Sequence, residues 1–270
     1  MNVEIVTPAG RERYLKILLV YVKKLYDLGK ITRWQVWVNT ENKSDIAYME
    51  NLAKEYSFIK LYYLETYYLH NRSIFGFFKH TVDEDTIYVR FDDDIVYVDI
   101  DGFDDFIKFR IDNPQYFLVY GNIINNALLT HVQQRFGNFT LGEGICGYSC
   151  TDTVGWKTPK FTKQIHHTFI NAVNSNDIEK FKFKEWLLYY HERCSINCFA
   201  FLGKEFKSFG GIVGEDEEQW LSVVKPKELQ KYCTVYGKFL VAHYSFYPQR
   251  EYLDQTDVLQ QYEEISKKFM

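Results

Sequence analysis

The residues best suited to chemistry are three consecutive carboxylates, Asp92–Asp94, which follow a largely apolar run. The run Ile87–Phe91 reads as a buried strand, and apolar residues resume at Ile95. Side chains alternate in an extended chain, so we expect Asp92 and Asp94 to point to one side of the strand and Asp93 to the other. Two carboxylates about 6 Å apart repel by roughly 3 kcal/mol at an effective dielectric constant of about 20. A positive partner is therefore expected between Asp92 and Asp94.

The partner that best fits two converging carboxylates is a hard divalent cation, Mn²⁺ or Mg²⁺. Such cations take oxygen ligands and commonly bridge one or two carboxylates to substrate phosphates. An apolar strand that ends in Asp-x-Asp therefore favours a site for a metal ion and a diphosphate. The alternative is a solvated acidic turn, because Asp is common in turns.

A second acidic cluster follows two glycines in the segment Ser208–Trp220, which reads SFGGIVGEDEEQW. Glycine allows a backbone to approach a ligand closely, and Gly211 is our candidate for such an approach. Asp216 lies among other carboxylates and is a candidate general base. The alternative is that these acids only stabilise the first turn of a following helix through the helix dipole.

A late histidine, His243, is a candidate metal ligand. It follows the β-rich run Tyr236–Ala242, so we expect it at the end of a strand. The alternative is a purely structural role, which is more common for a single histidine. Arg90, Lys238 and Arg250 are candidates for further positive charge near a diphosphate.

Composition restricts the class of protein. The chain has 270 residues, of which 46% are hydrophobic and 25% charged, and this length and composition predict one large domain. The net charge of −4, with Lys and Arg dispersed among the acids, argues against a nucleic-acid partner. We find no secretion signal and no apolar stretch long enough for a transmembrane helix, which predicts a cytoplasmic protein. The five cysteines, an odd number, favour reduced thiols.

Strands and helices alternate through the first half of the sequence. Strands are expected at 3–6, 34–38, 58–64, 87–91 and 116–122, and helices at 14–25, 44–56, 74–80 and 101–111. This alternation predicts an α/β fold with a mainly parallel sheet. Ligands of such sheets bind at the carboxyl ends of the strands, so residues 7–11, 39–44 and 92–94 are expected along one rim. Residues 125–207 are harder to interpret and are candidates for acceptor recognition.

Taken in order, these features resemble the GT-A glycosyltransferases. The resemblance covers most of the chain and implies a single GT-A (Rossmann-like) domain over 1–270. A nucleotide-sugar-binding half would span about 1–122, and an acceptor-binding half about 123–270. The resemblance implies a metal-dependent transfer of a sugar from a nucleoside-diphosphate sugar to a hydroxyl of a glycan acceptor, with Mn²⁺ or Mg²⁺ as cofactor. The segment Gly211–Glu217 is most similar to inverting members, in which the Asp of the Glu-Asp pair is the general base.

The resemblance also assigns roles to individual residues. Asp94 and His243 would bind the metal, Asp92 would contact the ribose or donor sugar with help from Asp93, and Asp216 would be the base. The base and ribose of the nucleotide would lie against Thr7, Pro8, Arg11, Asn39 and Glu41. The acceptor would contact Gly211, Glu215 and Trp220. No Gln-x-x-Arg-Trp element follows, which disfavours a processive membrane synthase.

Other interpretations remain open from the sequence. A retaining GT-A transferase is one, and a non-catalytic carbohydrate-binding protein of the same fold is another. A sugar nucleotidyltransferase shares the architecture, although its opening loop is rich in glycine and Thr7–Arg11 contains only one. Cys146, Cys150, Cys194 and Cys198, with His191 nearby, could form a zinc site, but their spacing also fits buried core cysteines.

Overall fold

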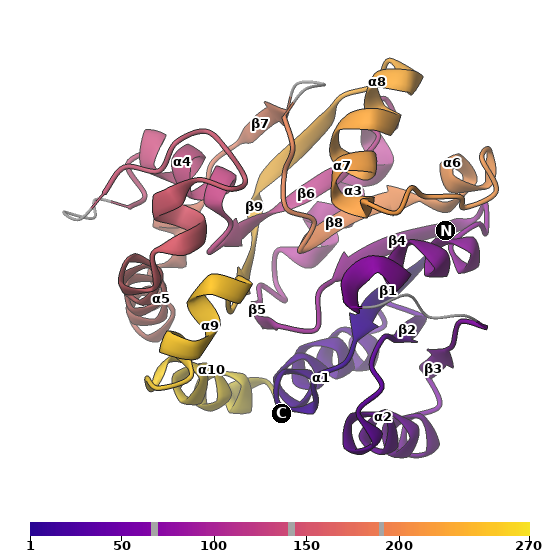
Figure 1. Ribbon diagram of the computed structural model, residues 1–270, viewed down its shortest axis with the longest axis horizontal. Coiled ribbons are helices and arrows are strands. Elements are labelled where there is room, and N and C mark those ends of the chain that lie inside the picture. Colours follow the sequence, from indigo (N-terminus) through magenta and orange to yellow (C-terminus); the bar gives the residue numbers. More distant parts are fainter. Residues whose placement is uncertain (66–69, 140–143, 189–191) are drawn as a thin grey trace.

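The chain folds around one large sheet whose strands come from the whole length of the sequence (Figure 1). This computed structural model describes residues 1–65, 70–139, 144–188 and 192–270. Within these residues the sheet has nine strands. They are β1 (Asn2–Ala9), β2 (Arg33–Val38), β3 (Ile59–Tyr62), β4 (Thr86–Phe91), β5 (Ile95–Val98), β6 (Val119–Ile124), β7 (Glu185–Leu188), β8 (Cys198–Leu202) and β9 (Cys233–His243).

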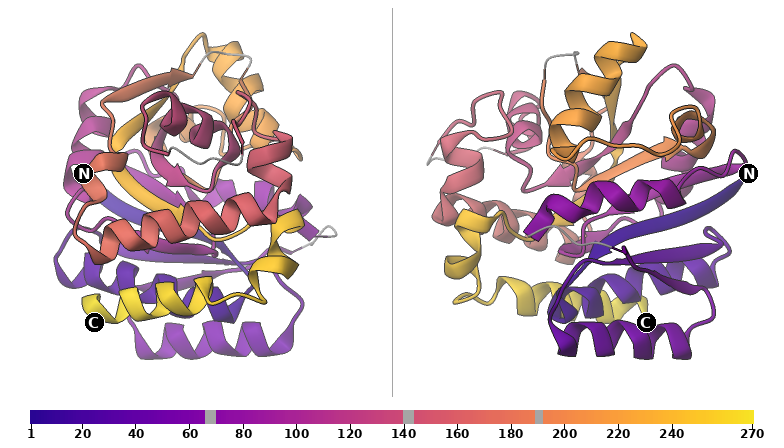
Figure 2. Two further views of the ribbon diagram at one scale, coloured as in Figure 1. Left: turned by 90° about the vertical axis from the view of Figure 1, so that its left-hand side faces the viewer. Right: turned by 45° about the vertical axis from the view of Figure 1, so that its right-hand side comes forward.

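Helices flank this sheet, and Figure 2 shows α1, α2 and α10 grouped on one side of it. The helices are α1 (Glu12–Asp27), α2 (Lys43–Glu55), α3 (Phe103–Asp112), α4 (Ala127–Arg135), α5 (Pro159–Asn174), α6 (Gly203–Lys207), α7 (Glu217–Gln219), α8 (Lys225–Leu229), α9 (Tyr247–Leu253) and α10 (Val258–Ser266). Shorter helical turns cover His70–His80, Thr153–Lys157, Ile178–Phe181, Trp220–Val224 and Lys267–Phe269. In α1 the buried side chains recur every three or four residues, so the helix has one apolar face, and it packs against β5.

The strand order separates a parallel part of the sheet from a mixed part. The order is β3-β2-β1-β4-β8-β6-β9-β5, with β7 also paired to β9. The neighbours from β3 to β4 run parallel, as do β6 and β9. The pairs β4–β8, β6–β8, β5–β9 and β7–β9 are antiparallel. The carboxyl ends of β1, β2 and β4 therefore lie at one edge.

The chain changes its place in the sheet between β4 and β5. These strands are separated only by Asp92–Asp94, yet β8, β6 and β9 stand between them in the strand order. β5 instead pairs with the last residues of β9, where Ile95 is opposite His243. This switch brings a segment near residue 94 against a segment near residue 243.

Aromatic side chains fill much of the core. Phe106 stacks on Phe239 with ring centroids 4.5 Å apart, which fixes α3 against β9. Phe201 packs against Phe206 with centroids 4.2 Å apart, linking β8 to α6. Most of the rings that make up 18% of the sequence are thus structural, as expected.

The predicted α/β fold class, a mixed sheet flanked by helices, is confirmed. Two local predictions are wrong. Residues 7–9 were expected in a loop but continue β1, and Pro8 is tolerated there because β4 pairs with β1 only as far as Val6. The four-residue spacing of Cys194 and Cys198 predicts that they lie one helical turn apart, but Cys198 begins β8.

Several elements of the second half were not predicted, among them helices α4 and α9 and strand β8. The division near residue 122 stays a prediction, and the sheet itself runs through both halves. Within the described residues, no helix has the combination of length and apolar composition that a membrane span requires.

Candidate active site

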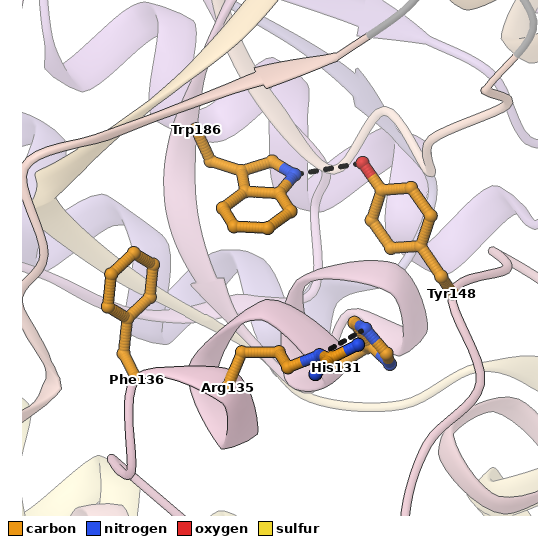
Figure 3. A pocket seen from close by; sticks show the side chains of 5 residues that line it. All are labelled: His131, Arg135, Phe136, Tyr148 and Trp186. Atoms are coloured by element: carbon orange, nitrogen blue, oxygen red, sulfur yellow. Dashed lines mark hydrogen bonds between the residues drawn. The ribbon is translucent and has the colours of Figure 1, made fainter.

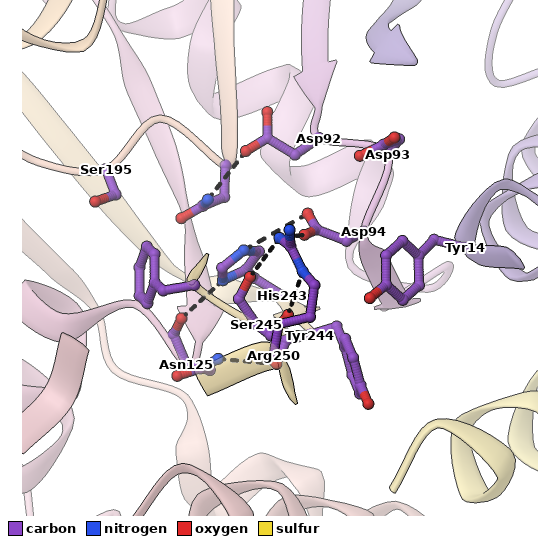
Figure 4. A network of polar contacts seen from close by, with 12 residues as sticks. Tyr14, Asp92, Asp93, Asp94, Asn125, Ser195, His243, Tyr244, Ser245 and Arg250 are labelled. Atoms are coloured by element: carbon purple, nitrogen blue, oxygen red, sulfur yellow. Dashed lines mark hydrogen bonds and ion pairs between the residues drawn. The ribbon is translucent and has the colours of Figure 1, made fainter. Parts of the chain in front are cut away.

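The three aspartates form a tight turn at the carboxyl end of β4. The backbone N–H of Ile95 donates to the carbonyl of Asp92 at 3.1 Å, which closes the turn. The prediction of simple alternation is therefore wrong, because these residues are not extended. Asp93 and Asp94 both contact Arg11, while Asp92 contacts Arg90 and Asn197. Figure 4 shows Asp94 beside His243 and Arg250.

Asp94 lies at the centre of a buried group of charged side chains. Its Oδ2 atom is 2.9 Å from Arg11 Nη2 and 3.5 Å from Arg250 Nη2, and its Oδ1 atom is 3.5 Å from His243 Nε2. Burial raises the pKa of the Asp94 carboxyl, but the positive charges of Arg11, His243 and Arg250 outweigh burial and hold this pKa well below its usual value. The structure thus places Asp94 and His243, the two predicted metal ligands, side by side.

Two backbone contacts hold His243 against Asp94. The backbone N–H of Tyr244 donates to the Asp94 carbonyl at 2.9 Å, continuing the β5–β9 pairing. His243 Nδ1 lies 3.0 Å from the carbonyl of Asn125, so Nδ1 carries the proton and Nε2 points at Asp94. Burial alone lowers the pKa of His243, but Asp94 outweighs it and raises this pKa. A neutral His243 therefore has its free lone pair beside a carboxylate oxygen.

Arg11 joins the end of β1 to the aspartate turn. Its guanidinium binds both oxygens of Asp93 as well as Asp94, and the backbone N–H of Gly10 donates to Asp93 Oδ2 at 3.0 Å. Arg11 also precedes α1, a helix of 16 residues, so the positive end of the helix dipole lies beside these carboxylates. Burial raises the pKa of Asp93, and Arg11 opposes this change.

The other residues predicted to hold the nucleotide are divided between the rim and the core. Asn39 follows β2, and its backbone N–H donates to the Ala9 carbonyl at 2.8 Å, which places it beside Gly10 at the rim. Glu41 is exposed in the same loop.

Thr7 is buried, and its hydroxyl accepts a hydrogen bond from the Trp34 indole at 2.9 Å. Pro8 lies within β1, opposite Trp37. Thr7 therefore has a structural contact inside the core.

Asp92 is the start of a second buried network. Arg90 Nη2 lies 2.9 Å from Asp92 Oδ1 and 3.0 Å from Glu217 Oε1, and the Asn197 amide donates to Asp92 Oδ2 at 3.0 Å. Burial raises the pKa of the Glu217 carboxyl to about 7, although Arg90 opposes the change. The network ties the second acidic cluster to the aspartate turn, as its place in the predicted site requires.

Replacing Glu217 by Gln is expected to reduce the dependence of stability on pH. A folded-state pKa of about 7 means that the folded protein keeps a proton that the unfolded chain loses above about pH 4.5. Between these two pH values the wild type should lose about 3 kcal/mol of unfolding free energy through this group. Gln mimics the protonated carboxyl, so between the same pH values the variant should lose about 3 kcal/mol less unfolding free energy than the wild type.

The measurement is chemical unfolding of both proteins at pH 5 and at pH 7.5. Glu263→Gln removes an exposed carboxylate on α10 and serves as the matched control. Equal changes between the two pH values in wild type and Glu217→Gln would contradict a raised pKa.

Asp216, the predicted base, lies at the surface next to Glu217. Its side chain is 59% exposed, and it accepts two hydrogen bonds from Arg193, both at 2.8 Å. It also caps α7 by accepting from the Gln219 backbone N–H at 3.2 Å. A carboxylate has about four acceptor positions, so one position on Oδ2 has no partner within the described residues. Asp216 is therefore held in place while remaining accessible.

The three residues predicted to contact an acceptor, Gly211, Glu215 and Trp220, differ in exposure. Glu215 is exposed, whereas Trp220 is half-buried and packs against Phe209 with ring centroids 5.5 Å apart. Gly211 has a positive φ of 67°, and a Cβ atom there would come within 2.6 Å of the Phe78 carbonyl. Gly211 is thus required by close packing within the protein, which is a structural reason for the glycine.

The remaining candidates lie apart from the aspartate turn. Lys238 is an exposed residue in the middle of β9.

All five cysteines are buried and free of disulfides, and burial raises the pKa of Cys146 to about 12 and that of Cys150 to about 11. In the part of the chain described, no group of three or more His, Cys, Asp or Glu side chains is arranged for a metal ion, so a four-thiolate zinc site is not formed. His191 lies outside the described residues.

Sequence reasoning missed three residues of the site, namely Asn125, Arg193 and Asn197. Asn125 adopts φ 61° and orients His243, and Asn197 binds Asp92 from the residue before β8. Each is a single polar residue in an irregular segment, and no periodic pattern marks it. The pair Asn125-Asn126, which ends β6, was the one available signal for a turn.

Comparisons with known proteins support the fold. No family model and no curated protein matches the chain. The solved structure of CMP:2-keto-3-deoxy-manno-octonic acid synthetase in complex with CTP aligns over 97% of this chain and all of its own, with 10% identity and a TM-score of 0.50. Residues 1–349 of TarS from S. aureus align over 100% of this chain and 70% of their own, with 12% identity and a TM-score of 0.50.

A further match is too weak to support the fold. Mannose-6-phosphate isomerase from Helicobacter pylori aligns over 46% of this chain and 51% of its own, with 15% identity and a TM-score of 0.34. At these identities the two longer matches show the fold alone. The chain shares the mixed α/β architecture of the CMP:2-keto-3-deoxy-manno-octonic acid synthetase and of TarS.

Proposed function

We propose that this protein is a metal-dependent glycosyltransferase that moves a sugar from a nucleoside-diphosphate sugar to a hydroxyl of a glycan acceptor. The observation that carries the proposal is the contact between Asp94, at the carboxyl end of a strand, and His243, which arrives from the other end of the chain. Glycosyl transfer also fits the shared fold, since TarS is a glycosyltransferase. The carboxyl ends of parallel strands are the usual ligand-binding edge of such sheets.

The residues beside Asp94 fit a divalent cation, Mn²⁺ or Mg²⁺. One carboxylate oxygen and one imidazole nitrogen lie 3.5 Å apart, and in the neutral ring this nitrogen would offer a lone pair to a cation because the other ring nitrogen donates to Asn125. A Mg²⁺-type ion typically takes one or two protein ligands and completes its shell with phosphates and water. Asp94 and His243 would hold it, and the ion would stabilise negative charge on the leaving diphosphate.

The side chains around this centre suit a nucleotide sugar. Arg11 and Arg250 would bind diphosphate oxygens, since both are within reach of Asp94 and each keeps a part-exposed guanidinium. Asp92, fixed by Arg90 and Asn197, would accept from a sugar hydroxyl. Asp216 would take the proton of the acceptor hydroxyl and so make direct displacement possible. We propose an inverting reaction on this basis.

The direct test is donor hydrolysis and ligand-induced stabilisation. We expect a thermal shift with UDP, GDP or CDP that requires Mn²⁺ or Mg²⁺, because a ligand at 100 times its Kd stabilises the folded state by about 2.7 kcal/mol. The same metal should support slow hydrolysis of the matching nucleotide sugar. No shift with any nucleoside diphosphate, with or without metal, would contradict the proposal.

Replacing His243 by Ala is expected to raise the Mn²⁺ concentration needed for nucleotide binding at least about tenfold, because the site loses one of two protein ligands. Calorimetric titration of Mn²⁺ at saturating nucleotide measures this change. His167, a part-exposed histidine on α5, provides the control variant His167→Ala. An unchanged titration in His243→Ala would remove His243 from the metal shell.

A sugar nucleotidyltransferase is the second candidate, because the CMP:2-keto-3-deoxy-manno-octonic acid synthetase in complex with CTP has this fold over its full length. One contact disfavours it. The backbone N–H of Gly10, which a phosphate-binding loop would leave free, donates to Asp93. Release of pyrophosphate from a nucleoside triphosphate and a sugar would identify this activity, whereas binding of sugars without turnover of any donor would indicate a non-catalytic carbohydrate-binding protein.

A further inference from the structure

We infer that a second site, remote from the aspartate turn, binds a negatively charged sugar unit of the acceptor. The site is a hollow of about 480 Å³ lined by His131, Arg135, Phe136, Tyr148 and Trp186, which we call the aromatic hollow (Figure 3). The inference rests on the proposed function, because it names the class of glycan that a transferase of this kind would accept. Three features of the hollow support it.

The first feature is a set of aromatic faces that the protein leaves open. Phe136 is 49% exposed, and one face of its ring stacks on Phe183 at 4.9 Å, so its other face is free. The rings of Phe136 and Tyr148 both lie edge-to-face with Trp186, at 6.0 and 6.1 Å. The negative face of an aromatic ring attracts the positive C–H groups on one face of a pyranose. The hollow therefore fits a sugar ring.

The second feature is that these walls are held in place before any ligand binds. The Trp186 indole N–H donates to the Tyr148 hydroxyl at 2.8 Å. His131 Nδ1 lies 2.6 Å from the Cys146 carbonyl, and the Cys146 backbone N–H donates to Gln134 at 2.9 Å. These bonds fasten the segment that carries Tyr148 to α4. A preformed site loses little conformational entropy on binding.

The third feature is an available positive charge. Arg135 is exposed, and within the described residues it forms no ion pair. Its one hydrogen bond in that part of the chain is a long one, 3.4 Å from Nε to His131 Nε2, so both terminal nitrogens of the guanidinium can donate. Such a planar fork matches a carboxylate or a phosphate. The charge favours an acidic group placed at Arg135, whereas the Glu192 carboxylate, which is hydrogen-bonded to Tyr148, disfavours an anion beside Tyr148.

The position of the hollow relates it to the acceptor. α4 begins next to Asn125, which holds His243, and it ends at Arg135. The rise of a helix places these two ends about 13 Å apart. A monosaccharide cannot contact both ends, so the hollow would hold a unit of an oligosaccharide some distance from the hydroxyl that reacts.

Saturation-transfer NMR with small saccharides tests the inference. The probes are methyl glucuronide, glucose 6-phosphate and the neutral methyl glucoside, each with the full chain in EDTA, so that no metal is needed. We expect both charged probes to bind and the neutral one to bind more weakly, with the carboxylate and phosphate arms identifying the preferred anion. Arg135→Gln should weaken binding of the charged probes at least about tenfold, since a charged hydrogen bond is lost.

Phe136→Ala should weaken the binding of all three probes. Tyr26→Ala is its matched control and should leave their binding unchanged. Tyr26 is another exposed ring, 37% accessible, that stacks on Phe58 at 4.2 Å in a different part of the surface. Binding should survive in Asp94→Asn, which separates this site from the proposed catalytic centre. Equal binding of all probes to wild type and Arg135→Gln would overturn the inference even if the protein turns over a nucleotide sugar, and binding without turnover would overturn only the proposed function.

Discussion

Asp94→Asn is expected to abolish metal-dependent binding of nucleoside diphosphates, raising the apparent Kd by more than about 10²-fold. Loss of residues that only orient metal ligands already costs 10–100-fold, and Asp94 would be a direct ligand. The substitution also removes the one negative charge that faces Arg11, His243 and Arg250 together. Calorimetry of UDP, GDP and CDP with Mn²⁺ measures the effect.

Asp93→Asn is the matched control for this prediction. Asp93 is buried in the same turn and pairs with the same Arg11, but it has no contact with His243 among the interactions of the described residues. It should bind the metal-nucleotide complex far better than Asp94→Asn. Both variants remove a buried charge partner and should lose stability, so circular dichroism must show that each is folded. Equal loss of binding in the two variants would show that neutralising Arg11, and not ligating a metal, is the function of these aspartates.

Asp216→Asn is expected to lower kcat by 10²–10⁴-fold with little change in nucleotide affinity, because general-base catalysis typically contributes that much. The structure adds a reason why this side chain is suited to the role. Arg193 and the Gln219 backbone N–H fix it, and one acceptor position on Oδ2 is left for a hydroxyl. Positioning of this kind is itself a large part of catalysis.

Glu217→Gln provides the comparison, since Glu217 is buried behind Arg90 and cannot reach a substrate as easily. Its effect on kcat should be smaller than that of Asp216→Asn. The configuration of the product, read by NMR of the new glycosidic bond, is an independent measurement. An inverted anomeric centre is expected. A retained centre, or a larger loss of kcat in Glu217→Gln, would exclude Asp216 as the base of a direct displacement.

The first half of the fold could be predicted because its pattern is regular. Between Asn2 and Phe91, short apolar runs that are typical of strands alternate with segments whose apolar residues have helical spacing. Each strand predicted there is present in the sheet. β8 was missed because a short apolar run such as Cys198–Leu202 fits a buried helix and a buried strand equally well. Its neighbours in the sheet, β4 and β6, are far away in sequence, and only their pairing decides between the two.

The sequence indicated which residues belong to the candidate site, but it did not indicate the contacts between them. Asp94 and His243 could be selected from the sequence because each is a possible metal ligand at the end of an apolar run. In the structure they are neighbours. The partners of the aspartates are arginines from three separate elements, and no local pattern shows that Arg90 connects Asp92 to Glu217. Burial of Glu217, which raises its pKa to about 7, depends on the same long-range packing.

The change of place between β4 and β5 also determines when the site can form during synthesis. Arg250 lies 156 positions after its partner Asp94, and the two meet only once β9 has paired with β5. A ribosome adds about 5–20 residues per second, so Asp94 waits roughly 8–30 s for Arg250, although Arg11 and Arg90 are already present. During that interval its carboxylate remains in water, with β5 as an unpaired edge. A truncation that removes β9 would leave that edge permanently exposed, and we expect such fragments to aggregate while the complete chain folds.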